Sequence, residues 1–454
     1  MTKPVSEREL VLAILLEVLE KGQYSHIVLS RTLEKYQYLE KKERAFITRV
    51  TEGTLEHLIE IDYILDYFSK VKVKKMKPVI RGILRSAVYQ LKYMDSIPDP
   101  AVCNEAVKLA VKKGFANLKG FVNGVLRNVA RNLEQVEYPE EERKALSVKY
   151  SMPEWILEMW ERDMPFSVIE KIAASFQQEI PVTIRCNQEK TSPEQLKAAL
   201  EAEGVTVEEH PYLPSAFRIS GYDYLKNLLC FRKGWFVVQD ISSMLAVEAA
   251  QVKENDQVLD VCAAPGGKAL YLAEKLKGTG MVEARDLTMY KTGLIEENIA
   301  RTGFQNIKAV CKDAAVLDEE TIGSADIVLA DLPCSGLGVL GKKTDLKYKV
   351  SPAGMKELVL LQRRILHTVQ NYVKPGGTLL YSTCTIHKEE NEENVHWFLK
   401  EHPAFVLEDI RKDLCLELQS SVNEEGWLQL LPGIHDSDGF FIARLRRRQE
   451  SDKI

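Results

Sequence analysis

Apolar residues recur with the period of an α-helix through the first 133 residues of the chain. Two groups of residues would each line one face of a helix: Val11, Ile14, Leu15 and Val18, and Ile59, Tyr63, Ile64 and Phe68. We therefore predict an all-α region over residues 1–136. The polar stretch at 137–143, which contains Pro139, predicts a linker after it.

The pattern becomes mixed between residues 150 and 235. Helical periodicity near 153–162 and 168–176 precedes a strand-like run at 182–186. A further helix is expected at 194–203, followed by more short apolar runs. This mixture predicts a small α+β domain over residues 150–235.

Short apolar runs alternate with helical stretches from residue 236 onward. The expected buried strands are 258–261, 280–284, 307–310, 326–330 and 378–381. Helical periodicity fills most of the intervals, most clearly at 289–302 and 355–373. Such alternation is typical of a doubly wound α/β fold with a mostly parallel sheet. We predict this third domain over residues 236–454.

The composition is that of an ordinary globular protein, with 45 % hydrophobic and 28 % charged residues among 454. This length favours two or three domains over one. No apolar run approaches the roughly 18 residues of a membrane span, and the first ten residues contain no apolar targeting segment. We expect a cytosolic monomer that makes no contact with membranes.

Eight cysteines are scattered along the chain, and no two of them are spaced as CxxC. A zinc knuckle is therefore not expected, and we predict no metal site. Disulfides are not expected in a reducing compartment. A cysteine of this chain is then by default a small buried apolar residue.

The net charge of −5 hides an asymmetry between the front of the chain and the rest. Residues 1–136 contain 23 Lys and Arg against 16 Asp and Glu. A basic front on an acidic chain indicates a polyanionic partner. The densest basic run consists of Lys70, Lys72, Lys74, Lys75 and Lys77. A charge run of this kind is usually a solvated face, and the local excess of positive charge makes contact with phosphates the alternative.

A glycine-rich turn follows the strand that ends at Asp260. The turn consists of Cys262, Ala263, Ala264, Pro265, Gly266, Gly267 and Lys268. A strand, a glycine turn and a helix bring backbone N–H groups and a helix N-terminus against a ligand, although a plain βα turn has the same elements. The spacing is not GxGxxG, so a dinucleotide pyrophosphate is not the natural ligand.

Two aspartates follow the next two predicted strands. Asp286 ends the second strand, where a carboxylate can accept hydrogen bonds from ribose hydroxyls. Asp313 follows the third strand and can contact an adenine amino group. Taken alone, Asp286 is equally a surface carboxylate, and Asp313 a turn-capping residue. Together with the glycine turn they indicate a nucleoside-containing cofactor.

Two cysteines lie at the ends of the fourth and fifth predicted strands. Cys334 follows the strand that leads to Asp331, and Cys384 follows the strand at 378–381. The carboxyl ends of the strands are where open α/β sheets bind their ligands. A buried structural thiol is the usual role for either cysteine, but two in equivalent places beside a cofactor turn favour chemistry.

Several motifs in the right order resemble those of the RNA 5-methylcytosine methyltransferases of the Nop2/Sun type. They are the glycine turn at 262–268, DLPCSG at 331–336, STCT at 382–385, EENE at 389–392, QDISS at 239–243 and DGFF at 438–441. The resemblance covers roughly residues 150–446. It implies a Rossmann-like methyltransferase domain that binds S-adenosylmethionine through the glycine turn, Asp286, Asp313 and Asp331.

The resemblance also implies roles for the residues at the strand ends. Cys384 is the nucleophile that attacks carbon 6 of a cytosine, Cys334 assists release of the adduct, and Asp331 hydrogen-bonds the N3 edge of the base. Lys268 can orient Asp331 or Cys384, or stay solvated at the helix start. The target base must be unpaired or flipped out of a helix to reach such a site.

Residues 5–133 resemble a NusB-like RNA-binding domain. Together with the local excess of positive charge, this resemblance favours contact of the lysine run with phosphates. This domain joined to this catalytic unit is similar to one branch of the family, and the similarity implies a target in 16S rRNA, cytosine 967 in conventional numbering. One departure is visible: the family usually has proline before the aspartate that follows Cys334, where this chain has Thr344 before Asp345.

Three other functions are compatible with parts of the sequence. An NAD-dependent dehydrogenase would share the fold class, but GxGxxG is missing and the paired cysteines would be unexplained. A non-catalytic RNA-binding assembly factor would not need both cysteines. A transfer-RNA methyltransferase of the same family is disfavoured by the NusB-like front.

Overall fold

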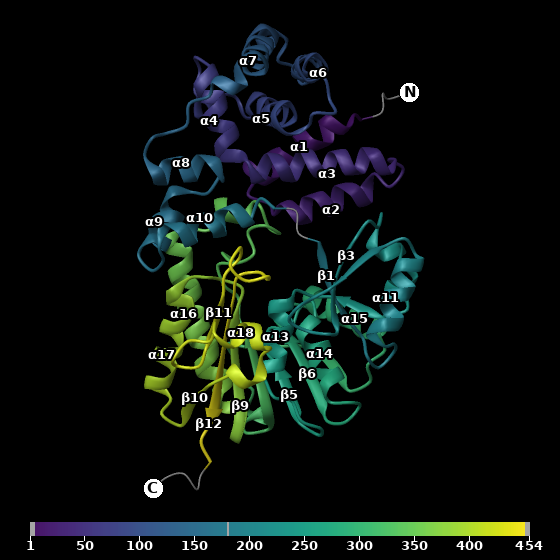
Figure 1. Ribbon diagram of the computed structural model, residues 1–454, viewed down its shortest axis with the longest axis vertical. Coiled ribbons are helices and arrows are strands. Elements are labelled where there is room, and N and C mark those ends of the chain that lie inside the picture. The colour runs from purple at the N-terminus through teal and green to yellow at the C-terminus, as the bar shows by residue number, and fades with distance from the viewer. Residues whose placement is uncertain (1–4, 179–180, 450–454) are drawn as a thin grey trace. The chain divides into compact units, whose positions relative to one another are not determined.

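The computed structural model describes residues 5–178 and 181–449, and the chain divides into two units (Figure 1). The first unit extends to Gln178 and also contains the later segment Leu340–Val350. The second unit contains Glu179–Val339 and the chain from Ser351 onward. The three-domain division drawn from the sequence stays a prediction.

The first unit is helical, as the apolar periodicity predicted. Its α-helices are α1 (Glu7–Leu19), α2 (Ser25–Lys35), α3 (Lys41–Glu56), α4 (Leu58–Phe68), α5 (Pro78–Tyr93), α6 (Asp99–Lys112), α7 (Lys119–Asn132), α8 (Glu142–Lys149), α9 (Glu154–Glu161) and α10 (Phe166–Ser175). The apolar face predicted for α1 is fully buried, since Val11, Ile14 and Leu15 are each 1 % exposed.

The face predicted for α4 is only partly right. Ile64 is fully buried, but Ile59 and Tyr63 are half-exposed, and Ile61 and Leu65 take their places in the core. The tyrosine explains the shift, because its ring reaches the surface and its hydroxyl donates a hydrogen bond to the backbone carbonyl of Glu137. An aromatic ring with a polar tip fits a boundary position as well as a core position.

The second unit begins with a small antiparallel sheet. Its strands are β1 (Val182–Cys186), β2 (Thr206–Glu209), β3 (Ala216–Ser220) and β4 (Phe236–Val238), in the order β2-β3-β1-β4. Helix α11 (Pro193–Ala202) packs Leu196 and Leu200 against it, and the short α12 (Leu229–Arg232) precedes β4. The predicted α+β character is confirmed, whereas the helices predicted at 153–162 and 168–176 belong to the first unit.

The larger sheet of the second unit has a parallel centre. Its strands are β5 (Gln257–Asp260), β6 (Met281–Asp286), β7 (Ile307–Cys311), β8 (Ala325–Asp331), β9 (Val373–Thr383), β10 (Phe405–Glu408), β11 (Leu428–Leu430) and β12 (Phe440–Arg447). The order is β10-β12-β9-β8-β5-β6-β7, and β9, β8, β5, β6 and β7 run parallel. All five predicted strands are confirmed. The antiparallel β12, which pairs with β9, β10 and β11, was not predicted.

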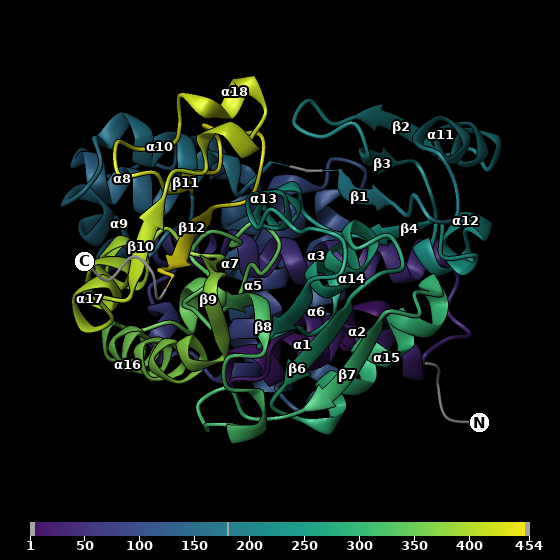
Figure 2. The ribbon, with the colours of Figure 1, turned by 90° about the horizontal axis from the view of Figure 1, so that it is seen from below.

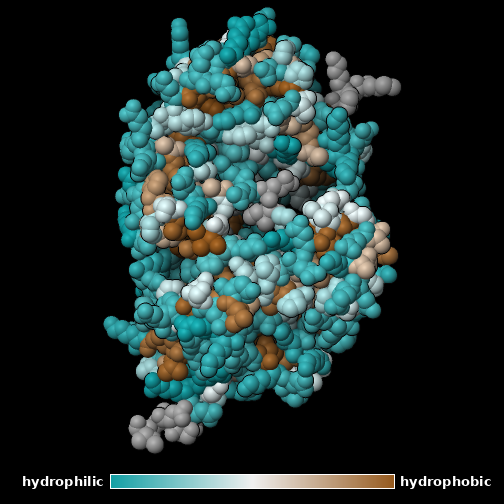
Figure 3. Space-filling view, in the orientation of Figure 1, coloured by the Kyte–Doolittle hydropathy of each residue, from teal (hydrophilic) through white to brown (hydrophobic). Residues whose placement is uncertain are grey.

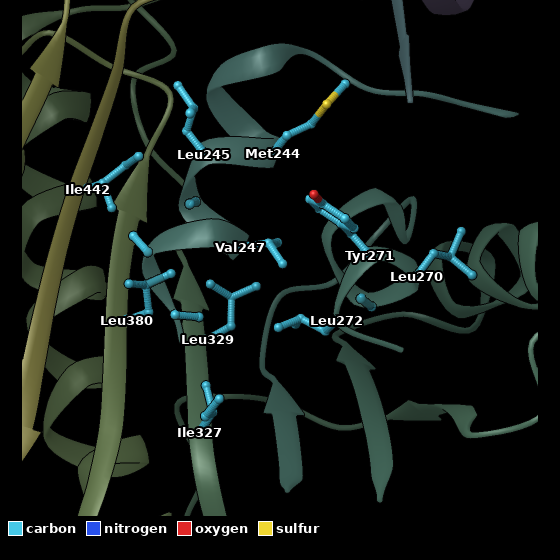
Figure 4. Packing of buried hydrophobic residues seen from close by; sticks show 14 of the residues in the cluster. Met244, Leu245, Val247, Leu270, Tyr271, Leu272, Ile327, Leu329, Leu380 and Ile442 are labelled. Carbon is cyan, nitrogen blue, oxygen red and sulfur yellow. The ribbon is translucent and has the colours of Figure 1, made fainter. Parts of the chain in front are cut away.

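Helices cover both faces of this sheet, as a doubly wound fold requires. They are α13 (Ile241–Ala249), α14 (Gly267–Lys275), α15 (Met289–Thr302), α16 (Pro352–Val369), α17 (Glu392–Glu401) and the short α18 (Leu416–Gln419). Alternate residues of β8 point to opposite faces: Leu329 packs with α13 and α14 (Figure 4), whereas Val328 packs with α16 and α17. Figure 2 shows the helices around the sheet from below.

Among the described residues, no helix is long and apolar enough to cross a membrane. The face of the molecule seen in Figure 3 is mostly hydrophilic, with small separate hydrophobic areas.

Candidate active site

The glycine turn joins β5 to α14 at the carboxyl edge of the parallel strands. Gly266 has φ of +107°, a left-handed conformation that glycine adopts at low cost. The backbone N–H of Ala263 donates to the carbonyl of Arg285 at 2.8 Å, which holds the turn against β6. Helix α14 begins at Gly267. Its first N–H groups have no acceptor within the helix and are available to a ligand.

Asp286 lies beside this turn, at the end of β6, and is 4 % exposed. One carboxylate oxygen accepts from the N–H of Ala264 at 3.0 Å, and the other from the N–H of Leu287 at 2.8 Å. Lys291 forms an ion pair with the same carboxylate, 3.0 Å apart. Asp286 therefore has a structural task in holding the turn, and its predicted contact with a ribose stays a prediction.

Asp313 lies two residues past β7 and is exposed. Its carboxylate accepts a hydrogen bond from the N–H of Ala315 at 2.9 Å, which is the turn-capping role that the sequence also allowed. The N–H of the preceding Lys312 donates to the carbonyl of Asp286 at 3.0 Å. The two aspartates thus follow neighbouring strands at the same edge of the sheet.

Asp260 is a further acidic residue at this edge of the sheet. It ends β5 and is fully buried, and burial raises the pKa of its carboxyl group to about 7. Within the described residues, its Oδ2 atom has no hydrogen-bond partner. The sequence shows only a strand-ending aspartate, and its burial depends on the packing of the neighbouring strands.

Asp331 and Lys268 form an ion pair at the end of β8. The Lys268 Nζ atom lies 2.6 Å from one Asp331 oxygen, and the Ser382 hydroxyl donates to the other at 2.8 Å. Burial alone would lower the pKa of Lys268, but the Asp331 carboxylate outweighs it and raises that pKa. The sequence left three roles open for Lys268: orienting Asp331, orienting Cys384 or remaining solvated. This ion pair supports the first of them.

The two cysteines meet at the same edge. The Sγ atoms of Cys334 and Cys384 are 3.3 Å apart, although 50 positions separate them in the chain. The contact with Cys384, together with burial, raises the pKa of Cys334 well above its ordinary value. Cys334 is therefore a protonated thiol at neutral pH. Two thiols in van der Waals contact beside an ion pair are not an ordinary apolar core.

A buried glutamate holds the loops that contain the two cysteines. Glu390 is 0 % exposed, and its carboxylate accepts from the N–H of Ser335 at 2.9 Å and from the Gln362 amide at 2.8 Å. The Ser335 and Thr385 hydroxyls are hydrogen-bonded at 2.8 Å. The EENE motif thus supports the site, a role that the sequence alone did not indicate.

The lysine run of the first unit surrounds a short 3₁₀ turn, Val73–Lys75. Val73 and Met76 are buried and fix the turn to the helical core, while all five lysines are exposed. The Lys72 ammonium donates to the backbone carbonyl of Asp66 at 3.0 Å. The turn presents its positive charges to solvent, where phosphates can reach them.

The doubly wound sheet, the glycine turn and the acidic strand ends define the second unit as a Rossmann-like, S-adenosylmethionine-dependent methyltransferase. Residues 247–446 match the model of the family 16S rRNA methyltransferase RsmB/F. Residues 5–131 match the NusB family, and residues 152–222 match the ferredoxin-like domain of RsmF/B-like methyltransferases.

Relatives match the chain along its whole length. "Probable ribosomal RNA small subunit methyltransferase B" of Bacillus subtilis is 36 % identical over 98 % of this chain and 100 % of its own. Ribosomal RNA small subunit methyltransferase B of Klebsiella pneumoniae is 30 % identical over 99 % and 100 %. The crystal structure of PH0851 superposes with a TM-score of 0.81 at 27 % identity, over 98 % and 99 % of the two chains. The chain belongs to the ribosomal RNA small subunit methyltransferase B family.

Proposed function

We propose that this enzyme transfers a methyl group to carbon 5 of a cytosine in 16S rRNA, with Cys384 as the covalent nucleophile. The observation that carries the proposal is the pair of thiols 3.3 Å apart beside the Asp331–Lys268 ion pair. The 16S rRNA substrate rests on the family and on the names of the full-length relatives. By the same relationship the target is cytosine 967 in conventional numbering.

Carbon 5 of cytosine is too weak a nucleophile to be methylated directly. When bound, S-adenosylmethionine supplies an electrophilic methyl group. The Cys384 sulfur adds to carbon 6 and breaks the aromaticity of the ring, which makes carbon 5 nucleophilic. The proton of the Cys384 thiol passes to N3 of the base as the sulfur adds, and the Asp331 carboxylate accepts a hydrogen bond from the resulting N3–H. Lys268 and Ser382 hold the two Asp331 oxygens in place for that contact.

Release of the product needs a second step. The carbon-5 proton passes to the sulfur of Cys334, and its electron pair restores the double bond between carbons 5 and 6. The carbon–sulfur bond breaks as the departing Cys384 sulfur takes the thiol proton of Cys334, and the proton on N3 is then lost to solvent. Cys334 assists this step, because its sulfur lies within 3.3 Å of the sulfur that must depart.

The residues at the sheet edge fit the cofactor. The first N–H groups of α14, which begins at Gly267, have no acceptor within the helix, and the buried Asp260 Oδ2 atom has no hydrogen-bond partner among the described residues. Asp260, Asp286 and Asp331 outnumber Lys268 and Lys291, the lysines paired with two of them, and this acidic excess favours a sulfonium cation. Methylation of 16S rRNA is tested by bisulfite mapping of rRNA from cells with and without the gene. If cells without the gene lose a bisulfite-resistant cytosine in transfer RNA and none in 16S rRNA, the proposed substrate is wrong.

Asp286→Ala is expected to weaken S-adenosylmethionine binding about 10- to 100-fold, the equivalent of one or two hydrogen bonds to a charged group. The loss combines a missing ribose acceptor with a looser glycine turn, since the carboxylate also holds the N–H of Ala264. Calorimetry measures it directly. Glu297→Ala, an exposed carboxylate on α15, is the control. Equal affinity in Asp286→Ala and the parent would remove Asp286 from the cofactor site.

Reversing the charge of Lys72, Lys74 and Lys75 is expected to weaken RNA binding and to lower the slope of log affinity against log salt by about 2 to 3. The reason is that fewer counterions are released from the phosphates. Filter binding at several salt concentrations measures the slope. Reversing Lys253, Lys277 and Lys308, exposed lysines of the second unit, controls for net charge. An unchanged slope would show that this turn does not contact phosphates.

A further inference from the structure

Helix α2 of the first unit is capped at its N-terminus by a residue from the distant segment 340–350. Asp345 is 1 % exposed, and its two oxygens accept from the N–H of Ser25 at 3.0 Å and from the Ser25 hydroxyl at 2.7 Å. Ser25 is the first residue of α2, and the N-cap residue Tyr24 provides no side-chain cap. A carboxylate is stabilising at this end of a helix, where N–H groups lack acceptors.

The same segment caps another helix at its C-terminus. The Lys347 Nζ atom donates to the carbonyl of Glu56, the last residue of α3, at 2.8 Å. Lys347 is 4 % exposed, and burial lowers its pKa to about 7. Lys349 donates to the carbonyl of Gln23 and pairs with Asp345, both at 2.5 Å. Buried charges are costly unless they are paired, so this segment is held in one place.

The loop that contains Cys334 leads directly into this segment. Within the second unit, the N–H of Gly338 donates to the carbonyl of Cys384 at 3.1 Å, and the N–H of Gly439 donates to the carbonyl of Gly338 at 2.9 Å. A Cβ atom on Gly338 would lie 2.0 Å from the Gly439 oxygen, so only glycine permits this approach. After Val339 the chain becomes part of the helical unit. The loop is therefore hydrogen-bonded to Cys384 at Gly338, and the segment 340–350 that continues it is held by α2 and α3.

We propose that the helical unit is a positioning element for Cys334, with Asp345 and Ser25 as its anchor. The proposal rests on the proposed function, in which Cys334 assists release of the adduct. Cys384 directly follows β9, which pairs with β8 and β12 within the second unit. A misplacement of about 1 Å is enough to slow a reacting group strongly. Loss of the anchor should therefore slow release and leave attack by Cys384 intact.

The test uses the full-length protein with Asp345→Ala and, as a milder change, Ser25→Ala. We expect turnover to fall about tenfold or more in Asp345→Ala, with a larger share of protein covalently joined to RNA than in the parent. RNA affinity should stay within about twofold, since the phosphate-contacting lysines are untouched. Asp345→Asn keeps an oxygen that accepts from Ser25 and should recover part of the turnover. A denaturing gel measures the adduct, and filter binding the affinity.

Glu9→Ala is the matched control in the same unit. Glu9 caps the start of α1 through the N–H of Ser6 and pairs with Lys112, without contact to the segment 340–350. It should lower thermal stability but leave turnover and adduct at parental levels. Unchanged turnover in Asp345→Ala, or weaker RNA binding without adduct, would overturn the positioning role. If Cys334→Ala itself accumulates no adduct in the same assay, the proposed function fails and the positioning role with it.

Discussion

Cys384→Ala is expected to abolish methyl transfer, whereas Cys334→Ala is expected to trap protein joined to RNA. Without the Cys384 sulfur, carbon 5 is never activated, and the rate should fall by at least about 10³. Without Cys334, attack and methyl transfer still proceed but the adduct cannot break down. The trapped species is a band that survives denaturing electrophoresis and disappears after nuclease treatment. Methylated RNA should be recovered from that band.

The asymmetry between the two variants decides the assignment. Their Sγ atoms are 3.3 Å apart, so a merely structural role would give both variants the same modest loss of stability and no trapped species. Trapping by Cys384→Ala would mean that the two roles are reversed. Cys311→Ala, at the exposed cysteine that ends β7, should behave as the parent.

Local sequence patterns were sufficient to predict the parallel core of the methyltransferase unit. Strands β5, β6, β8 and β9 are largely buried, so they form short apolar runs, and the carboxyl ends of these parallel strands must meet at one edge. This is why Asp286, Asp331, Cys334 and Cys384 could be expected together. The antiparallel strand β12 was missed because its partner β9 lies far away in the chain, and nothing local indicates that pairing.

The contacts between distant parts of the chain were beyond the sequence. Ser25 and Asp345 are 320 positions apart, and Asp345 could be noticed only because Thr344 departs from the family pattern. Segment 340–350 lies in the catalytic half of the sequence but belongs to the helical unit. The role of Glu390 is equally hidden, since a glutamate among other glutamates looks like a solvated helix start. Its burial follows from the packing of α16 against the cysteine loops.

Breaking the ion pair between Lys268 and Asp331 is expected to have the second large effect on the rate of methyl transfer. Lys268→Met is expected to slow single-turnover methyl transfer about 10²- to 10³-fold at saturating cofactor and RNA. The change removes the cation that lies 2.6 Å from Asp331 and leaves only the Ser382 hydroxyl to orient the carboxylate. In the variant, Asp331 then binds the N3 edge of the adduct less well than it does in the parent enzyme. Ser382→Ala removes the other support and should cost less, about tenfold.

The step at which the ion pair acts is resolved by placing Lys268→Met in the Cys334→Ala background. Release is blocked there, so the appearance of the covalent band reports attack and transfer alone. We expect the band to form more slowly by the same factor as methyl transfer. The control is Lys275→Met, at a lysine on the same helix as Lys268. It breaks a 2.8 Å ion pair with Glu248 of α13 and should leave the rate unchanged. If the band forms at the parental rate, Lys268 does not support the attack, and the orientation of Asp331 has no part in forming the adduct.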